Sequence, residues 1–437
     1  MISRHRLRRL LAPAAGLRTA TVTTVLGLCL FFFGVALSFK VVILPFLEAI
    51  SALGEQPFRV LFTLEDAAVA RHVLGGVFLL AGIYLSYIGV RAVIRHVMKT
   101  INPSVRSTSM TDLYLRRQQL AYGPRVVALG GGTGLSTLLR GLKHHTSNIT
   151  AIVTVTDDGG SSGMLIQEKG MIPPGDIRNC LVALADAEAS MTNLFQHRFK
   201  QGSGALSGHS VGNLLIAALV DQSAGDFEKA VQSASAVLAI RGSVVPSTLD
   251  HVGLCAIFED GRTICGETKI VETKQPIRRV YLDPPDCVAH PEALEAIRTA
   301  DLICIGPGSV YTSVIPNLLV PGIAEALRDS PAVKVYVCNV MTQRGESDSF
   351  SASEHVSTIL LNVDYRIFDY VMVNIGVPNQ SIADRYADSG QFLVEADTDR
   401  LRAMGFTVIA TDLISESDVV RHDPMKAAAA ALELLNQ

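Results

Sequence analysis

The chain has 437 residues, of which 49% are hydrophobic and 18% are charged, and its formal net charge is -3. This length and composition exclude an intrinsically disordered chain and allow more than one structural unit. Because a general nucleic-acid binder needs a concentrated basic surface, the near-neutral charge argues against nucleic acid as a partner.

The seven cysteines are scattered along the chain and include no C-x-x-C pair. An odd number at such spacings is typical of reduced thiols in a cytoplasmic domain, so the sequence predicts neither a disulfide framework nor a zinc site. Cys304 and Cys338 lie inside apolar runs and are expected to be small core residues.

Two long apolar runs occupy the first hundred or so residues. They extend over about 22–46 and about 73–90, and each is long enough to cross the hydrocarbon core of a membrane. Arginines precede the first run and follow the second, so the positive-inside rule places both ends in the cytoplasm. The sequence therefore predicts a two-pass anchor in the cytoplasmic membrane over residues 1–100, a polar linker over 101–124 and a cytoplasmic domain over 125–437.

After Arg125, strand-like apolar runs alternate with helical ones. Strands are expected at Val126–Leu129, Ile149–Val155, Leu302–Ile305 and Val333–Val340, and helices at 177–187, 191–199, 212–220, 227–238 and 424–435. This alternation predicts an α/β fold of the Rossmann type, a mostly parallel sheet with helices on both faces. Glycines break an apolar–polar alternation between Val252 and Thr273, so an antiparallel hairpin or meander is expected there.

The first predicted strand is followed by a glycine-rich turn that leads into a helix. This turn has neither the closing Gly-Lys-Ser/Thr of a Walker A loop nor the G-x-G-x-x-G spacing. It still offers backbone N–H groups and hydroxyls at a helix N-terminus, the arrangement that binds phosphate. The candidate phosphate ligands are Gly131, Gly132, Thr133, Gly134 and Ser136, and a tight turn without a ligand is the alternative.

A second glycine-rich turn follows the second predicted strand. Asp157 and Asp158 come first, where a Rossmann fold places the carboxylate that binds a ribose. Adjacent carboxylates next to phosphate oxygens also suit Mg²⁺, and an ordinary Asp-Gly turn is the third interpretation. Gly160, Ser161 and Ser162 complete this turn as candidate anion ligands.

Two later segments begin helices and carry polar residues. Asp176 is a candidate N-cap, and Arg178, with Asn179 beside it, is a candidate phosphate clamp, because a guanidinium binds two phosphate oxygens in one plane. His209 and Asn213 are four residues apart and could share one helical face, with His209 either structural or an acid–base group.

A third glycine-rich loop follows the strand at Leu302–Ile305. Gly306, Gly308 and Ser309 could hold a phosphate, and Tyr311 could stack on a base or sugar. Because loops at the carboxyl ends of parallel strands line one edge of a sheet, the three glycine-rich loops are expected to converge. Near the end of the chain, Arg421 and His422 are either a solvated pair or a ligand clamp.

Several ordered blocks together resemble the family of gluconeogenesis factors and 2-phospho-L-lactate transferases, specifically its YvcK-like bacterial branch. The blocks are Gly130–Ser136, Thr156–Gly163, Pro173–Asn179, Phe195–Phe199, Gly208–Asn213, Gly306–Ser313 and Asn339–Gln343. The resemblance covers nearly all of residues 125–437, whereas the two apolar runs depart from the soluble members.

The resemblance implies a nucleotide-binding Rossmann-like domain and a role in cell shape and in growth on gluconeogenic carbon sources. YvcK-like members resemble binders of UDP-sugars such as UDP-N-acetylglucosamine, and by that analogy Tyr386 and Arg421 become candidate contacts. The transferase branch moves a phospholactate-type group from a nucleotide diphosphate donor with Mg²⁺, which implies a rival role for Asp157 and Asp158.

The leading hypothesis is a membrane-anchored regulator that binds a UDP-sugar and adjusts cell-wall synthesis or central carbon flux. It rests on glycine loops that come without a convincing nucleophile or base. The rival is an Mg²⁺-dependent transferase in which Asp157 and Asp158 hold the metal and Arg178 stabilises the diphosphate. An NAD-type oxidoreductase is disfavoured by the missing G-x-G-x-x-G. Whether the chain turns over a substrate, forms a homo-oligomer or binds cell-wall synthesis proteins stays open.

Overall fold

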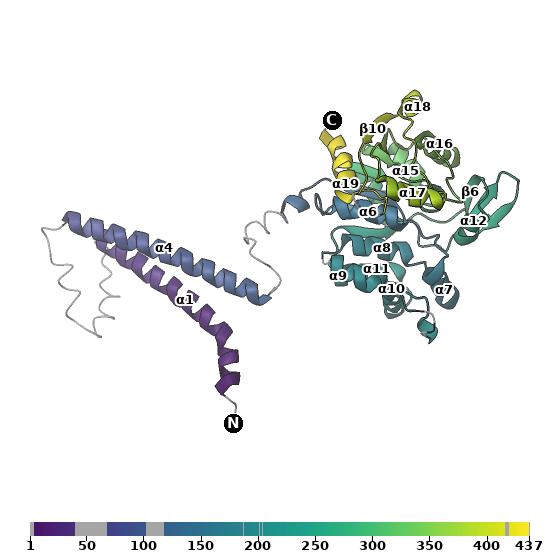
Figure 1. The fold of residues 1–437 in the computed structure, drawn as a ribbon. Helices are drawn as coiled ribbons and strands as arrows, with labels where there is room; N and C mark the ends of the chain where they lie inside the picture. The colour runs from purple at the N-terminus through teal and green to yellow at the C-terminus, as the bar shows by residue number, and fades with distance from the viewer. Residues whose placement is uncertain are drawn as a thin grey trace. The chain divides into compact units, whose positions relative to one another are not determined.

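The computed structural model describes residues 4–39, 68–101, 118–186, 188–200, 202, 204–415 and 419–436. The chain divides into two compact units, Met1–Leu113 and Tyr114–Gln437 (Figure 1).

The N-terminal unit is a pair of long apolar helices, α1 (Arg4–Phe39) and α4 (Ala68–Ile101). Within them, Thr19–Ser38 and His72–Ile94 are long and apolar enough to cross a membrane, which confirms two candidate spans. The predicted continuation of the first span over 40–46 and residues 102–117 of the predicted linker lie outside the described residues.

The two helices pack through glycines, so their backbones approach closely. A methyl group added at Gly34 would lie 2.5 Å from the backbone nitrogen of Leu79, and one added at Gly82 would overlap the backbone of Phe31. Small residues at the contact between two helices are typical of helix pairs in membranes, where close van der Waals packing replaces the hydrophobic effect.

Gly82→Leu is expected to separate the helix pair, because backbone atoms of α1 leave no room for a side chain. Gly76→Leu is the matched control, since no atom lies within 4 Å of a methyl group added there. Cysteines introduced at Phe33 and Phe78, whose ring centroids are 5.3 Å apart, report the packing by oxidative cross-linking in a Cys29→Ser background. Gly82→Leu should lose most of the cross-link and Gly76→Leu should keep it. Equal yields would show that the helices do not pack closely at Gly82.

The second unit contains a seven-stranded sheet in the order β10-β9-β8-β7-β1-β2-β3. Every neighbouring pair is parallel. The strands are β1 (Val126–Gly130), β2 (Ile149–Val153), β3 (Ser243–Pro246), β7 (Leu302–Ile305), β8 (Val333–Val337), β9 (Tyr370–Asn374) and β10 (Thr407–Thr411). The prediction of a mostly parallel, Rossmann-like sheet is confirmed.

Helices cover both faces of this sheet, because its central strands are apolar on both sides. Val126 and Ala128 of β1 belong to one hydrophobic core, whereas Val127 and Leu129 belong to the other. The first core is covered by α6 (Gly132–Leu142), α8 (Gly175–Leu184), α10 (Val211–Gln222), α11 (Phe227–Leu238) and α19 (Pro424–Glu433). The second is covered by α13 (Pro291–Thr299), α14 (Ile315–Leu319), α15 (Ile323–Asp329), α16 (Ala352–Val363) and α18 (Thr398–Ala403).

Further helices lie in the connections: α7 (Gly160–Lys169), α9 (Glu188–Gln196), α12 (Glu267–Thr273), α17 (Gln380–Asp388) and the π-turn η3 (Val310–Val314).

The domain begins earlier than expected, since Leu120 is buried and its carbonyl accepts a hydrogen bond from the Ser147 N–H at 2.9 Å. The predicted linker therefore does not extend to residue 124.

The predicted antiparallel part is a three-stranded sheet, β5-β4-β6, of β4 (Gly253–Phe258), β5 (Thr263–Cys265) and β6 (Ile277–Asp283). Its pairing places Cys255 opposite Cys265, and these residues form a disulfide. The prediction of reduced cysteines is therefore wrong for this pair, because strand pairing brings together two cysteines that no local motif marks. Cys304 and Cys338 are buried as expected.

Candidate functional site

The strand order reverses between β1 and β7, so the loops that follow these neighbouring strands lead away from each other. A crevice at such a switch point is the usual ligand site of an open α/β sheet. A pocket of about 230 Å³ lies there. It is lined by Gly131, Gly132, Thr133, Gly134, Thr137, Pro307, Gly308, Ser309, Ser313, Asn339, Val340, Met341, Thr342, Gln343, Tyr386, Gln391, Val420, Arg421 and His422.

The first glycine loop forms one wall at the N-terminus of α6. Gly131 is the N-cap in an extended conformation and has no side chain with which to cap the helix, but the buried Asp176 carboxylate accepts a hydrogen bond from the Gly132 N–H. Gly134 touches the third loop closely: an added methyl group would lie 2.7 Å from the carbonyl carbon of Pro307. The N-terminal end of α6 borders the pocket, and the remaining N–H groups of its first turn suit an anionic ligand.

The third glycine loop forms the facing wall. Asn339, at the end of β8, accepts a hydrogen bond from the Gly308 N–H at 3.1 Å and donates one to the Gly308 carbonyl at 2.8 Å. Tyr311 does not reach the pocket: it is buried, and its hydroxyl donates to the Ile277 carbonyl at 2.9 Å. The prediction that Tyr311 stacks on a ligand is therefore wrong, because the π-turn directs its ring into the core.

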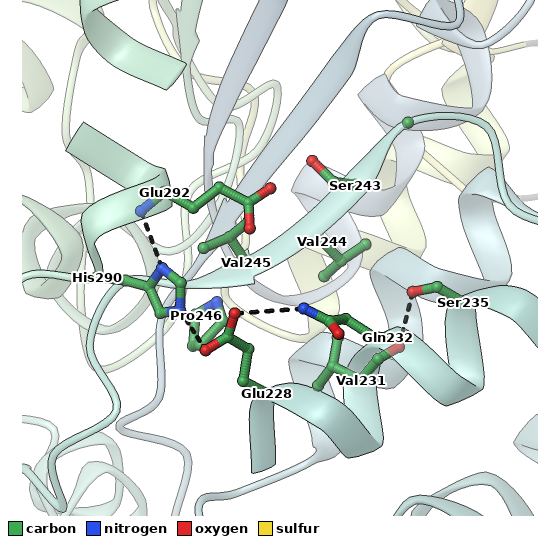
Figure 2. Close-up of a pocket in the computed structure, with 11 residues that line it drawn as sticks. Glu228, Val231, Gln232, Ser235, Ser243, Val244, Val245, Pro246, His290 and Glu292 are labelled. Atoms are coloured by element: carbon green, nitrogen blue, oxygen red, sulfur yellow. Dashed lines mark hydrogen bonds and ion pairs between the residues drawn. The ribbon is translucent and has the colours of Figure 1, made fainter. Parts of the chain in front are cut away.

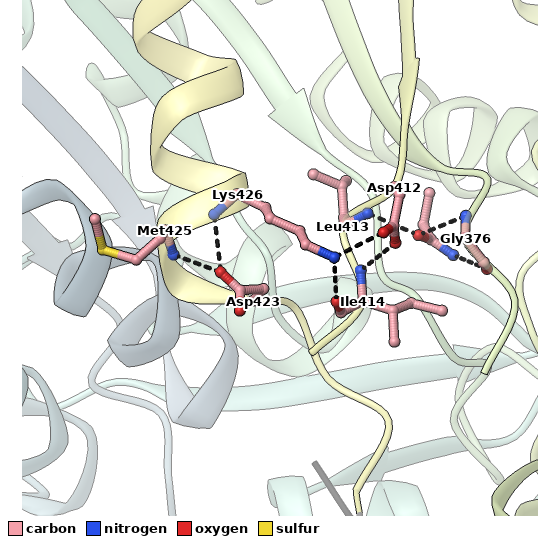
Figure 3. Close-up of polar contacts among 8 residues, drawn as sticks. Gly376, Asp412, Leu413, Ile414, Asp423, Met425 and Lys426 are labelled. Carbon is pink, nitrogen blue, oxygen red and sulfur yellow. Dashed lines mark hydrogen bonds and ion pairs between the residues drawn. The ribbon is translucent and has the colours of Figure 1, made fainter. Parts of the chain in front are cut away.

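The segment before α19 brings Arg421 to the same pocket. Lys426 anchors it through Asp412 Oδ2 at 2.7 Å and the Ile414 carbonyl at 3.0 Å (Figure 3). Arg421 is exposed, and within the described residues its guanidinium makes no hydrogen bond or ion pair. This cationic group is therefore available to a ligand.

His422 is buried beneath Arg421, so it is not half of a solvated pair. Its Nε2 donates to the Cys338 carbonyl at 3.1 Å, and burial lowers the pKa of the imidazole to about 4. His422 is therefore neutral near pH 7 and supports the pocket floor.

Eight predicted residues share this pocket although they come from distant parts of the chain: Gly131, Gly132, Thr133, Gly134, Gly308, Ser309, Tyr386 and Arg421. Ser136 and Gly306 lie behind it in the same two loops. The Ser136 hydroxyl donates to the Thr133 carbonyl at 3.0 Å, and the Gly306 N–H donates to the Leu129 carbonyl at 2.8 Å.

The second glycine loop lies at the same sheet edge, after β2, but does not line this pocket. Its two aspartates turn to different partners. Asp157 Oδ1 accepts the Gly159 N–H at 3.0 Å, whereas Asp158 Oδ1 accepts the Thr268 N–H at 2.9 Å and hydroxyl at 2.8 Å. Gly160 is exposed, and Ser161 and Ser162 are buried.

The predicted polar residues of α8 and α10 satisfy one another. Arg178 is buried, and it donates to Ser210 Oγ at 2.6 Å, Asn213 Oδ1 at 2.8 Å and Asn179 Oδ1 at 2.9 Å. These contacts hold α8 against α10 and leave only its Nε without a partner.

His209 precedes the N-cap of α10, so it is not on a helical face with Asn213 as predicted. Its Nδ1 is 3.2 Å from Ser161 Oγ, and both side chains are buried. Within the structure, His209 therefore links the second glycine loop to the start of α10.

Sequence reasoning missed a group of carboxyl side chains beside the second loop. Asp176 is not an N-cap, since Pro174 occupies that position. Burial, and then the Asp157 carboxylate, raises the pKa of Asp176 to about 6. Burial raises the pKa of Glu346 to about 7 and, with Asp157, raises that of Glu267 well above its ordinary value.

These carboxyl groups do not form a ready metal centre. Among the residues that the structure describes, no three His, Cys, Asp or Glu side chains are arranged to hold a metal ion. Nothing local in the sequence marks Glu267 or Glu346, because the small sheet and η3 bring them here from distant positions.

A separate pocket of about 210 Å³ lies at the sheet edge between α11 and β3 (Figure 2). There His290 Nδ1 accepts the Glu292 N–H at 3.2 Å, and its Nε2 is 3.6 Å from Glu228 Oε2. None of the residues that line this pocket was predicted as a site residue.

Comparison with known proteins agrees with this geometry. The family described as 2-phospho-L-lactate transferase CofD matches residues 126–414. The gluconeogenesis factor of Bacillus subtilis is 48% identical over 315 residues, which are 72% of this chain and 99% of that protein. The gluconeogenesis factor of Halalkalibacterium halodurans is 48% identical over 309 residues, 70% of this chain and 95% of that protein.

A solved structure shows the same fold. The crystal structure of protein BH3568 from Bacillus halodurans matches with a TM-score of 0.68 and 48% identity, covering 71% of this chain and 99% of that one. The predicted resemblance is thus confirmed over the second unit. The chain belongs to the CofD family, among relatives that are named gluconeogenesis factors.

Proposed function

We propose that the pocket between β1 and β7 binds a nucleoside diphosphate sugar of the UDP-N-acetylglucosamine type. The observation that carries this proposal is that the N-terminus of α6 and the exposed Arg421 border one pocket. A helix N-terminus and a guanidinium both bind phosphate oxygens, and a diphosphate spans two such groups. Tyr386, on α17, offers an aromatic face for the base or sugar.

We further propose that the protein is a regulator and not an enzyme. Among the residues that the structure describes, the pocket lining contains no Asp, Glu, Lys or Cys, and its histidine is neutral and bonded to a carbonyl. General acid–base or nucleophilic chemistry needs such groups within reach of the ligand. Ligand occupancy would then control growth on gluconeogenic carbon sources, in keeping with the names of the relatives. By our proposal it would also control cell-wall synthesis.

The two apolar helices would anchor this regulator in the cytoplasmic membrane, with both chain ends in the cytoplasm. Reporter fusions at each terminus test the orientation. A periplasmic reporter that is active at the C-terminus would overturn it.

Titration calorimetry of Tyr114–Gln437 tests the ligand. This part corresponds to the whole of the solved relative, so it is expected to fold alone. UDP-N-acetylglucosamine, GDP and NAD are each titrated with and without Mg²⁺, followed by a product assay. Binding of the UDP-sugar without product supports the regulator, whereas consumption of any nucleotide contradicts it.

Arg421→Ala is expected to weaken UDP-sugar binding about tenfold, because a charge-assisted bond to phosphate is lost. Arg402→Ala is the matched control: Arg402 is an exposed arginine on α18 that pairs with Asp399 and does not line the pocket. If both variants bind like the unmodified chain, Arg421 is not a phosphate ligand.

A transferase is the second candidate, favoured by the carboxyl group of Asp176 beside Asp157. Burial and the Asp157 carboxylate raise the pKa of Asp176 to about 6 although Arg178 lowers it, and Mg²⁺ with a diphosphate would supply further positive charge. Turnover that requires Mg²⁺ and is lost in Asp176→Asn would support this candidate. Its absence with every nucleotide would remove it.

A further inference from the structure

The Cys255–Cys265 disulfide fastens the edge of the small antiparallel sheet. Cys255 is fully buried, whereas Cys265 is exposed on β5. β5 has three residues and pairs with β4 alone among the described strands, so its backbone hydrogen bonds hold it only weakly. The disulfide is the covalent link that keeps β5 in place.

The residues that directly follow Cys265 reach the second glycine loop. Gly266 donates its N–H to the Leu254 carbonyl at 2.8 Å, which positions the start of α12. Thr268 then donates its N–H and its hydroxyl to Asp158 Oδ1 at 2.9 and 2.8 Å. Gly266 is packed so tightly that an added methyl group would lie 2.6 Å from Asp158 Oδ2. The disulfide is therefore coupled through this short segment to the position of Asp158.

Glu267 lies between these contacts in the sequence. It lies beside Asp157, Asp176 and Glu346, and burial and these like charges raise the pKa of its carboxyl group well above the ordinary value. Ionisation of Glu267 next to the other carboxylates is unfavourable, so its carboxyl group holds its proton more tightly in the fold. The disulfide lies on one side of Glu267 in the sequence and the Asp158 contact on the other.

We propose that Cys255 and Cys265 form a reversible thiol–disulfide modification site that controls whether Thr268 holds Asp158. This inference rests on the cytoplasmic orientation proposed above, since in that compartment an exposed disulfide is formed and broken with the redox state and is not a permanent cross-link. The oxidised chain keeps Asp158 bound to the start of α12. The reduced chain releases β5 and with it the second glycine loop.

The co-reactant is a dithiol of the kind that cells use to reduce protein disulfides. One of its thiolates attacks the exposed Sγ of Cys265, the S–S bond breaks, and Cys255 leaves as a thiolate that takes up a proton. The second thiol of the reductant then attacks the mixed disulfide, releasing the Cys265 thiol and leaving the reductant as a disulfide. Two electrons pass from the dithiol to the protein.

Hydrogen exchange on the full chain in detergent tests this proposal without any nucleotide. The chain is compared after treatment with oxidised glutathione and after dithiothreitol, and alkylation followed by peptide mapping reports the thiols. Reduction is expected to expose Cys255 and Cys265 to alkylation. It is also expected to speed exchange at the Thr268 amide and over residues 157–163 about tenfold, as local opening does.

Three variants sharpen the test. The double variant Cys255→Ser/Cys265→Ser should exchange like the reduced chain in both treatments. Asp158→Ala, which removes the acceptor of both Thr268 hydrogen bonds, should exchange fast over 157–163 whether the disulfide is present or absent. Cys29→Ser, which alters a cysteine of α1, should keep the full redox response.

The proposal is overturned if oxidised glutathione yields no Cys255–Cys265 disulfide, or if exchange over 157–163 is the same in both states. Should the double variant fail to fold, the unmodified chain in its two redox states still gives the comparison. Because the readout involves no ligand, a failure here is distinct from a failure of the nucleotide-sugar proposal.

Discussion

Gly134→Ala is expected to abolish nucleotide-sugar binding by the pocket between β1 and β7. The added methyl group would overlap the Pro307 carbonyl oxygen and lie 2.7 Å from its carbon and 2.9 Å from the Gly308 nitrogen. These are backbone atoms, and Asn339 holds Gly308 from both sides, so they cannot rotate away. The N-terminus of α6 and the third loop must therefore move apart, and the two walls can no longer contact one diphosphate.

The expected loss of affinity is about 100-fold or more, which corresponds to roughly 3 kcal/mol. Calorimetry with UDP-N-acetylglucosamine measures it, and thermal unfolding checks that the domain still folds. Gly253→Ala is the matched control, because its added methyl group would have only an ordinary contact, 3.8 Å from the Asp283 carbonyl oxygen. A folded Gly134→Ala variant that binds normally would show that the ligand does not lie between these two loops.

The sequence predicts the core of this architecture well because its signals are local. Val126–Gly130 and Leu302–Ile305 are continuous apolar runs that end in glycines, so both strands and both loops could be placed. β10 escaped prediction since its residues are mostly half-exposed at the sheet edge and give no such run. β3 and β9 are also short, and nothing local marks their ends.

The candidate site was less predictable because several of its contacts join distant positions. Asn339 completes the third loop only when β8 lies beside β7. Arg178 was predicted to be a phosphate clamp, but in the fold its guanidinium is buried and donates to Ser210 and Asn213. Tyr386 was proposed only through family resemblance, whereas Arg421 was also proposed from the sequence as a possible ligand clamp with His422.

The disulfide between Cys255 and Cys265 was also not predictable from the local sequence. Spacing rules recognise metal and redox motifs within a few residues, whereas Cys255 and Cys265 are ten residues apart. Their pairing depends on the register between β4 and β5, which places them directly opposite each other. A one-residue change in register would have turned one of them to the other face of the sheet.

Glu346→Gln is expected to stabilise the domain at alkaline pH and to leave it unchanged in acid. The pKa of Glu346 is raised from an ordinary 4.5 to about 7 by burial, so the folded chain holds this proton more tightly than the unfolded chain. The stability that this proton provides is fully present below pH 4.5 and is lost as the pH rises through about 7. Glutamine carries no charge and escapes that loss.

At pH 8, Glu346→Gln is expected to raise the free energy of unfolding by up to about 3 kcal/mol. The pKa of Glu346 is raised from 4.5 to about 7, and each unit corresponds to about 1.36 kcal/mol. The amide oxygen of glutamine can still accept the Thr312 hydroxyl, which is 2.8 Å from Glu346 Oε1. Denaturant unfolding of Tyr114–Gln437 at pH 5 and pH 8 measures the difference, with the exposed Glu272→Gln as control. Lower stability of Glu346→Gln at pH 8 would mean that a charged Glu346 is stabilised in the fold. Loss of its advantage on adding Mg²⁺ would identify the cation as the stabilising partner and would favour the transferase.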